Sequence, residues 1–353
     1  MFYINEDVKN LYRIFDQHER AGYLRLDLNE NPVGFDQEFI DKVLSKATPE
    51  FISMYPETKP FQDKLADFLG VKNENICLTN GSAEAVRYVI EAFSSHGGTV
   101  LGVKPSYAMY EVFSKMYGRN FIYCPYEGTS VDLDKFIGMI TPDVDLAVVL
   151  NPNNPFGDVY TEEEMQRIVD KCQECETTLL VDEAYHYFYD KTFLPFAMKY
   201  EHVIVTRTFT KMFALGSGRL GFAVGHADDI QYIQKLCTPH NVNAFGMLFA
   251  EAVLDTEGML DEMIKKQKDG KQFVIDELTK RGYHLSYGEG NYIFVKPKTD
   301  AETVMDRMKE EKKILIKTYD LSNYGYDGKY LRVSTGEIAA MQQFLDGLDE
   351  IDK

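Results

Sequence analysis

The sequence predicts an α/β protein with a mostly parallel central sheet, helices on both faces of that sheet, and a smaller α+β domain. Three observations support this prediction. Short apolar runs alternate with helix-length stretches through the middle of the chain. These runs are almost continuously apolar, as in parallel strands that are buried on both faces. From about residue 229, a long helical stretch and a shorter strand–helix–strand pattern replace this order.

The strands of the central sheet are expected where β-rich runs occur, at 75–79, 98–103, 145–150, 177–185, 202–209 and 220–225. Helical patterns between the earlier runs provide the crossovers that parallel strands require, at 83–95, 108–118 and 161–175. The C-terminal part is expected to hold a long helical stretch at 244–282, strands at 291–297, 312–320 and 329–336, and a helix at 301–311.

Composition excludes several classes of protein. The chain has 353 residues and a net charge of -18, which repels polyanions and argues against bulk nucleic-acid binding. No run approaches the roughly 18 apolar residues of a membrane span. The first 15 residues contain no uninterrupted apolar segment, so no signal peptide is expected. We therefore expect a soluble, cytoplasmic protein.

The five cysteines are expected to be reduced thiols. Cys172 and Cys175 form a C-x-x-C pair, which would suit redox chemistry or half of a zinc site. They lie in a helical pattern, and no second pair of cysteines or histidines lies nearby to complete four zinc ligands. Two helical cysteines one turn apart are the favoured interpretation, and no metal site is expected.

The segment 216–221 matches the dinucleotide-binding pattern G-x-G-x-x-G. That pattern works between a strand and a following helix, with an acidic residue about 20 positions further on. Here the last glycine begins the strand-like run GFAV, so we do not expect a dinucleotide site.

Polar residues follow four of the predicted strands, where ligand sites of open α/β sheets gather. Each group has a plain alternative: Ser82 and Asp182 could cap helices, and Lys211 could be a surface lysine. Together they predict one anion-binding pocket that contains a lysine. The groups are Asn80–Glu84, Asn151–Gly157, Asp182–Tyr185 and Thr206–Lys211, with Arg219 eight residues later.

This set suits pyridoxal 5'-phosphate (PLP). A lysine is needed to form a Schiff base with the cofactor aldehyde. A carboxylate keeps the pyridine nitrogen protonated, so that the ring can act as an electron sink. A helix N-terminus, hydroxyl groups and an arginine can hold the phosphate.

The order of motifs resembles fold-type I, class I/II PLP-dependent aminotransferases, and most closely their histidinol-phosphate aminotransferase branch. The motifs are NGSAE, PSYAMY, NPNNPFG, VDEAY, TFTK and GRLGF, together with LNENPVG, YPE, PHNVNAF, GNYIFV and LRVSTG. The resemblance covers the whole chain. Its motifs are specific for the cofactor and less specific for the substrate.

The resemblance implies roles for individual residues. Lys211 is the Schiff-base lysine and the base that moves the substrate proton, and Asp182 pairs with the pyridine nitrogen. Tyr185 and Asn154 hydrogen-bond the ring oxygen, and Tyr107 stacks on the ring. The phosphate is held by Ser82, Ala83, Thr208, Thr210 and Arg219, and by Tyr55 from the neighbouring subunit of a homodimer with shared active sites.

Substrate contacts are implied in the same way. Arg332 binds the anionic group of the substrate, and Asn29 in LNENPVG also lies on the substrate side. Lys317 stands where the histidinol-phosphate enzymes commonly have an arginine. It keeps the charge but lacks the two-pronged guanidinium, which places histidinol phosphate itself in question.

The resemblance also implies a division into an N-terminal segment (1–45), a large PLP-binding domain (46–228) and a small α+β domain (229–353). The N-terminal segment joins the small domain or the dimer interface. The expected function is a PLP-dependent aminotransferase for a small anionic amine or amino acid, with glutamate and 2-oxoglutarate as the second pair. A decarboxylase resembling threonine-phosphate decarboxylase is the alternative. A non-catalytic PLP-fold regulator is a third hypothesis, which the intact Lys211 disfavours.

Overall fold

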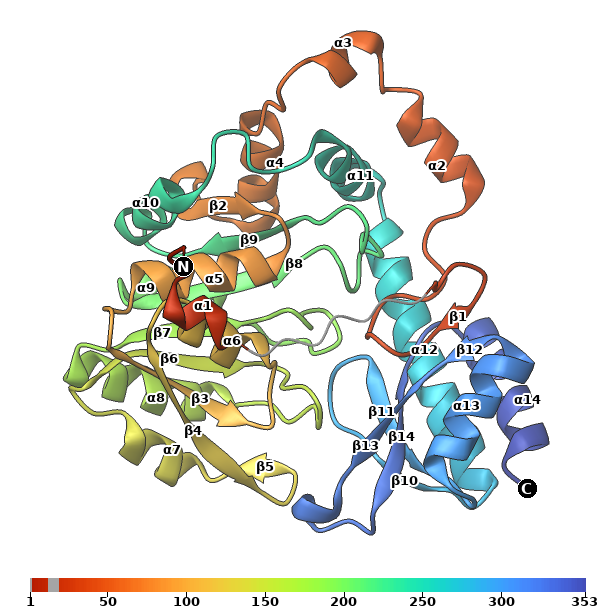
Figure 1. Ribbon diagram of the computed structural model, residues 1–353. Coiled ribbons are helices and arrows are strands. Elements are labelled where there is room, and N and C mark those ends of the chain that lie inside the picture. The colour runs from red at the N-terminus through yellow and green to blue at the C-terminus, as the bar shows by residue number, and fades with distance from the viewer. Residues whose placement is uncertain (1, 12–18) are drawn as a thin grey trace.

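The computed structural model describes residues 2–11 and 19–353, and its centre is an eight-stranded sheet (Figure 1). All of its strands except the two at one edge carry a run of buried residues, as continuous apolar segments predict. In spatial order the strands are β2 (Ile76–Thr79), β9 (Gly221–Val224), β8 (Val203–Thr208), β7 (Thr178–Asp182), β6 (Val144–Leu150), β3 (Thr99–Lys104), β4 (Asn120–Glu127) and β5 (Ser130–Val131).

The core of this sheet is mostly parallel. The pairs β3–β4, β3–β6, β6–β7 and β7–β8 are parallel, whereas β9 runs antiparallel to β2 and β8. The register sets Leu150 beside Asp182, and Asp182 beside Thr206. The residues that follow these strands therefore meet at one edge of the sheet.

Alternate residues of the strands face two separate cores. In β6, Leu146 and Val148 belong to one apolar cluster, and Ala147 and Val149 belong to the other. This two-residue period places helices on both faces. The first cluster includes residues of α4 (Lys59–Leu69), α5 (Ser82–Ala92), α6 (Met109–Met116), α10 (Ala227–Leu236) and α11 (Ala244–Asp255), and the second includes residues of α7 (Leu133–Met139), α8 (Glu162–Cys175) and α9 (Leu194–Lys199).

A second unit follows in the C-terminal part of the chain (Figure 1). Its antiparallel sheet has the order β10 (His284–Ser286), β11 (Tyr292–Lys296), β14 (Lys329–Ser334) and β13 (Lys317–Asp320). A third apolar cluster joins this sheet to α12 (Met259–Lys280), α13 (Ala301–Lys312) and α14 (Ile338–Ile351). The predicted fold class, a mostly parallel sheet plus a smaller α+β unit, is confirmed.

The N-terminal region reaches this second unit. Strand β1 (Leu24–Arg25) pairs in parallel with β12 (Ile314–Leu315). The remaining short elements are α1 (Glu6–Lys9), α2 (Gln37–Leu44), α3 (Pro49–Ser53), η1 (Asn73–Asn75) and η2 (Ser322–Tyr324). In Figure 1, α2 and α3 form a connection that stands out from the body of the molecule.

Packing suggests a division different from the expected boundary at 229. Helices α10 and α11 contribute buried residues to the core of the large sheet. Met259 and Ile264, at the start of α12, pack against the same core. Later residues of α12, such as Val274 and Leu278, lie in the third cluster. We propose that the boundary between the units lies within α12.

Several expected elements differ in detail. The helical stretch at 244–282 is broken between α11 and α12, where Gly258 adopts a left-handed φ of 72°. The expected strand at 312–320 is divided into β12 and β13, which pair with different partners. Strand β4 was not expected, because much of it is exposed and its apolar pattern is broken.

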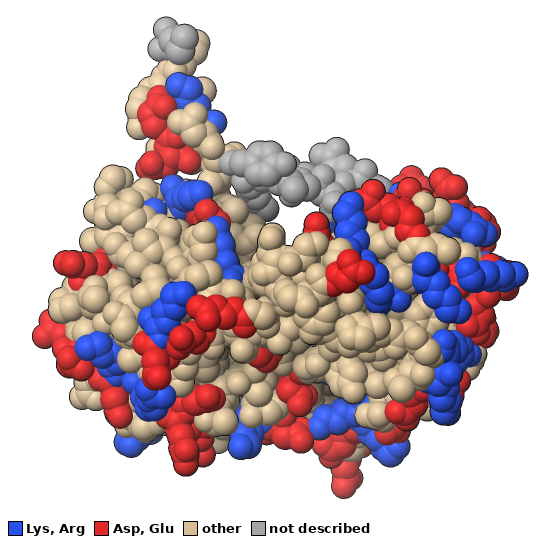
Figure 2. All heavy atoms as spheres, turned by 90° about the horizontal axis from the view of Figure 1, so that it is seen from below, with Lys and Arg blue, Asp and Glu red and all other residues tan. Residues whose placement is uncertain are grey.

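Three further findings concern the C-x-x-C cysteines, membrane-spanning helices and the surface charge. Cys172 and Cys175 lie on α8, which begins with a capping box between Thr161 and Glu164, and both thiols are buried and free. Among residues 2–11 and 19–353, no helix combines the length and apolarity needed to cross a membrane. On the face drawn in Figure 2, basic and acidic side chains are interspersed over both units.

Candidate active site

A cavity of ≈ 310 Å³ lies at the edge of the large sheet where the polar strand ends meet. It brings together residues from the N-terminal region, the large sheet and β14. Its lining contains the predicted residues Asn29, Ser82, Ala83, Tyr107, Asn154, Asp182, Tyr185, Thr208, Thr210, Lys211, Arg219 and Arg332, and in addition Leu28, Leu150 and Ala184.

The anion-binding end is built on the turn before α5. Gly81 is the N-cap, with φ 80°, and Ser82 is the first helical residue, so Ser82 is not the helix cap that its plain interpretation required. A side chain at Gly81 would meet Arg219 Nη2 at 2.8 Å. The Arg219 guanidinium therefore lies against the N-terminus of an 11-residue helix, and both attract an anion.

Two hydroxyl groups extend this end of the cavity. Thr208 Oγ1 donates a hydrogen bond to Thr210 Oγ1 at 2.9 Å, and Thr210 N donates to Thr208 Oγ1 at 3.2 Å. Thr208 is the last residue of β8, where it pairs with Gly221 of β9. These hydroxyls, the helix N-terminus and Arg219 form a set of donors suited to a phosphate group.

Lys211 lies at the centre of the site. Its Nζ donates to the carbonyl oxygen of Leu28 at 2.9 Å. Burial, helped by the positive charges of Arg332 and Arg219, lowers the pKa of Lys211 to about 8, although Glu30 opposes this shift. The amine is thus closer to its neutral, nucleophilic form than an exposed lysine would be.

Asp182 presents a buried carboxylate to the same cavity, with 2% of its surface exposed. Oδ2 accepts from Tyr110 Oη at 2.8 Å, and Oδ1 accepts from Thr206 Oγ1 and Ala184 N at 3.1 Å. Burial raises the pKa of Asp182 to about 6, against the opposing effect of these hydrogen bonds. The next helix begins only at Leu194, so Asp182 is not a helix cap.

Two asparagines and Arg332 line the side that faces the second unit. Asn29 Nδ2 donates to Tyr185 Oη at 2.9 Å, and burial raises the pKa of that phenol. Arg332 Nη2 donates to the carbonyl oxygen of Asp27 at 2.7 Å, and its Nη1 lies 3.4 Å from Asn154 Oδ1. Buried Nε of Arg332 has no hydrogen-bond partner among the described residues, so one donor is available.

The structure does not bring two predicted residues into this cavity. Tyr55, between α3 and α4, is 76% exposed and stacks on His240, with 4.5 Å between ring centroids. Lys317 pairs in register with Arg332 on the neighbouring strand, so both side chains project from the same face of the sheet, but only Arg332 lines the cavity.

Sequence reasoning missed the residues that hold Asp182. Thr206 was noted only as part of a polar group, although its position opposite Asp182 follows from the pairing of neighbouring parallel strands. Tyr110 comes from α6, and no local spacing links it to Asp182. Among the described residues, no group of three or more His, Cys, Asp or Glu side chains could hold a metal ion.

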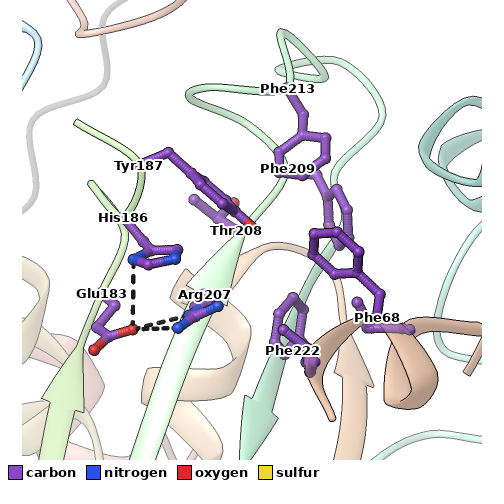
Figure 3. Close-up of a pocket in the computed structure, with 11 residues that line it drawn as sticks. Phe68, Glu183, His186, Tyr187, Arg207, Thr208, Phe209, Phe213 and Phe222 are labelled. Carbon is purple, nitrogen blue, oxygen red and sulfur yellow. Dashed lines mark hydrogen bonds and ion pairs between the residues drawn. The ribbon is translucent and has the colours of Figure 1, made fainter. Parts of the chain in front are cut away.

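A second cavity, of ≈ 10 Å³, lies beside the first, with Thr208 shared between them (Figure 3). On one wall, Glu183 accepts from Arg207 Nε at 2.9 Å and from Phe193 N at 2.6 Å. Burial lowers the pKa of His186 to about 2, so the imidazole is neutral. The buried Glu183–Arg207 ion pair joins the end of β7 to β8 beside this second cavity.

Comparisons with known proteins agree with this arrangement. The family model for class I and II aminotransferases matches residues 22–348. A histidinol-phosphate aminotransferase of Thermoanaerobacter pseudethanolicus is 30% identical over 353 residues, which cover 99% of this chain and 98% of the relative.

Two solved structures share the fold. The histidinol-phosphate aminotransferase of Sinorhizobium meliloti, in complex with pyridoxal-5'-phosphate, has a TM-score of 0.86 at 21% identity, covering 99% of this chain and 97% of the other. L-threonine-O-3-phosphate decarboxylase of Porphyromonas gingivalis has a TM-score of 0.76 at 22% identity, covering 93% and 98%. At these identities the structures establish the fold alone, whereas the family model covers most of the sequence. The chain belongs to the class I and II aminotransferases.

Proposed function

We propose that this aminotransferase uses PLP to transfer the amino group of a small anionic amine or amino acid. The observation that carries the proposal is one cavity that holds a lysine with a lowered pKa, a buried carboxylate and an anion-binding helix N-terminus. The bound cofactor named for the Sinorhizobium meliloti structure supports the same choice.

The residues present fit this cofactor. A carboxylate offers about four acceptor positions, and three donors already reach Asp182. One position remains to hold a proton on a ring nitrogen, and a positive charge there would favour the ionised form of Asp182. At the other end, the donors around Ser82 and Arg219 suit the phosphate.

When bound, PLP supplies an aldehyde that takes up the amino group and a ring that withdraws electrons from the substrate. Lys211 Nζ then moves the substrate proton. Tyr185 and Asn154 would hold the ring oxygen, and Tyr107 would stack on the ring. Ser82, Ala83, Thr208, Thr210 and Arg219 hold the phosphate.

Arg332 supports an anionic substrate. It lines the cavity on the side of the second unit, and its buried Nε lacks a partner among the described residues. We assign it the substrate carboxylate or phosphate, with Asn29 beside it. Histidinol phosphate is the substrate that the relative's name suggests, and glutamate with 2-oxoglutarate is the proposed second pair. Lys317 would contribute only if its side chain moved into the cavity.

We also propose a cytoplasmic homodimer with shared active sites. Tyr55 does not line the cavity of its own chain and is 76% exposed, which leaves it free to complete the phosphate site of a second copy. Sedimentation of the purified protein measures its oligomeric state, and a dimer is expected. Removal of the Tyr55 hydroxyl in Tyr55→Phe should weaken PLP retention.

A panel of amino donors tests the proposed reaction. The PLP-loaded protein is mixed with glutamate, histidinol phosphate, phosphoserine or threonine phosphate, without an acceptor. We expect the matching 2-oxo product from glutamate and from at least one phosphate-bearing donor, with no CO₂. Release of CO₂ from threonine phosphate without an oxo product would favour the decarboxylase. Absence of any product, in a protein that retains PLP, would overturn both hypotheses.

A further inference from the structure

Two cysteines from distant parts of the chain lie side by side at the edge of the large sheet. Cys77 is in β2, and Cys237 directly follows α10. Their sulfur atoms are 3.5 Å apart, although 160 positions separate them in sequence. No sequence pattern links the two thiols, and neither lines the proposed PLP cavity.

Hydrogen bonds between residues that follow the two cysteines in sequence hold these two segments together. Asn241 Nδ2 donates to the carbonyl oxygen of Leu78 at 2.9 Å, and Asn80 Nδ2 donates to the carbonyl oxygen of Asn241 at 2.5 Å. The thiol contact is therefore part of a fixed junction between β2 and the segment after α10.

The two thiols differ in access and in acidity. Cys77 is 3% exposed, whereas Cys237 is partly exposed. The contact between the two thiols lowers the pKa of Cys237 and raises the pKa of Cys77. The accessible sulfur is thus the one that ionises first, and the buried thiol lies behind it, as in a pair of reacting and resolving cysteines.

We propose that Cys237 and Cys77 form a disulfide-forming pair whose oxidant is hydrogen peroxide. In the first step the Cys237 thiolate attacks one peroxide oxygen, the O–O bond breaks, and hydroxide leaves, which gives a sulfenic acid. In the second step the Cys77 sulfur attacks the Cys237 sulfur and the S–O bond breaks. The departing hydroxide takes the Cys77 proton, so two thiols and one peroxide give a disulfide and two waters.

The bond requires a modest movement. A disulfide holds its sulfur atoms about 2.05 Å apart, so the present 3.5 Å must close by more than 1 Å. Cys237 ends α10 with an extended ψ of 137° and leads into a connecting segment, which can supply this movement more readily than β2 within the sheet.

The C-x-x-C pair provides a contrast to these two cysteines. Cys172 and Cys175 are both buried on α8. Burial raises the pKa of Cys172 to about 12, and the Cys175 thiol donates to the carbonyl oxygen of Ile140 at 3.4 Å. Because both thiols are buried, this C-x-x-C pair should resist peroxide.

The experiment treats the PLP-loaded protein with hydrogen peroxide, removes the peroxide, unfolds the chain and labels free thiols with N-ethylmaleimide. Untreated protein should take five labels, one for each cysteine, and oxidised protein should take three. Peptide mass spectrometry without reductant should find Cys77 linked to Cys237 within one chain. Loss of the link on reduction should restore five labels.

Variants assign the steps. Cys237→Ser should keep all of its remaining labels after peroxide. Cys77→Ser should stop at the sulfenic acid, which dimedone traps on Cys237. The double variant with serine at 172 and 175 should still form the link. Five labels on oxidised wild-type protein, a link between other cysteines, or a link only between two chains would each overturn the proposal. Because Cys237 is partly exposed, its serine variant tests the proposal even if Cys77→Ser does not fold.

Discussion

Replacing Asp182 with asparagine separates a catalytic carboxylate from a structural one. The substitution keeps the size of the side chain and one carbonyl oxygen, but it removes the negative charge and one acceptor atom. In the structure, both carboxylate oxygens of Asp182 accept hydrogen bonds, and the side chain belongs to no helix cap. A loss of turnover larger than one missing hydrogen bond explains would therefore reflect the charge that faces the cofactor.

The size of the effect follows from burial. Asp182 is only 2% exposed, so its pairing with a protonated ring nitrogen would be almost fully desolvated. Removing one partner of a buried charge pair costs about 3–5 kcal/mol. At about 1.36 kcal/mol for each factor of ten, kcat should fall by roughly two to four orders of magnitude. Since Lys211 is unchanged, the variant should still bind PLP covalently.

The assay measures kcat with glutamate and 2-oxoglutarate, and absorbance measures bound PLP. Asp158→Asn is the matched control, because burial also raises the pKa of Asp158 to about 6 and Tyr126 Oη donates to it at 2.7 Å, but it lies outside the PLP cavity. Thermal unfolding of both variants corrects for general damage. Near-normal turnover in Asp182→Asn, or an equal loss in Asp158→Asn, would refute the assigned role.

Four other outcomes are expected. Lys211→Ala should abolish turnover while leaving the thermal unfolding of the PLP-free protein nearly unchanged. Because burial lowers the pKa of Lys211 to about 8, the PLP-free protein should bind PLP covalently faster as the pH rises through about 8, and a rate independent of pH, followed by absorbance, would contradict this. Glu183→Gln should lower the free energy of unfolding, measured by denaturation, by about 3–5 kcal/mol, because it leaves the buried Arg207 without its ion-pair partner. The control Lys59→Ala removes an exposed ion pair and should cost at most about 1 kcal/mol in the same experiment. Arg332→Ala should raise KM for anionic substrates by roughly ten- to a hundredfold, the equivalent of about 1.5–3 kcal/mol. Lys317→Arg should improve the use of histidinol phosphate if the guanidinium fork is what the site lacks. If steady-state kinetics show an unchanged KM in both variants, substrate recognition lies elsewhere.

Much of the large sheet was predictable because its strands are buried on both faces. In the run 145–150, every position after Asp145 is then apolar, which distinguishes it from the intervening helices. Strand β4 escaped because its exposed positions break that pattern. The division between β12 and β13 escaped because it depends on β1, which lies about 290 positions earlier and pairs with only one of them.

The cavity was predictable to the extent that strand ends define it. Parallel strands place the residues after them at one edge, so Asp182 and Lys211 could be brought together without knowledge of the helices. Tyr110 was not accessible to this reasoning, because its contact with Asp182 depends on how α6 packs. Tyr55 and Lys317 came from resemblance alone, and the single chain places neither in the cavity.

The contact between Asn29 and Ser334 has a consequence for how the protein is made. The backbone N–H of Asn29 donates to Ser334 Oγ at 2.8 Å across 305 positions of sequence, and Asn29 also holds Tyr185. A chain leaving the ribosome can form its large sheet first, since domains tend to fold as they emerge. The wall of the cavity that carries Asn29 and Arg332 cannot form until β14 has been made. A nascent chain that still lacks β14 therefore has Lys211 beside an incomplete wall, and the ability to bind a substrate arises only after β14 has been made.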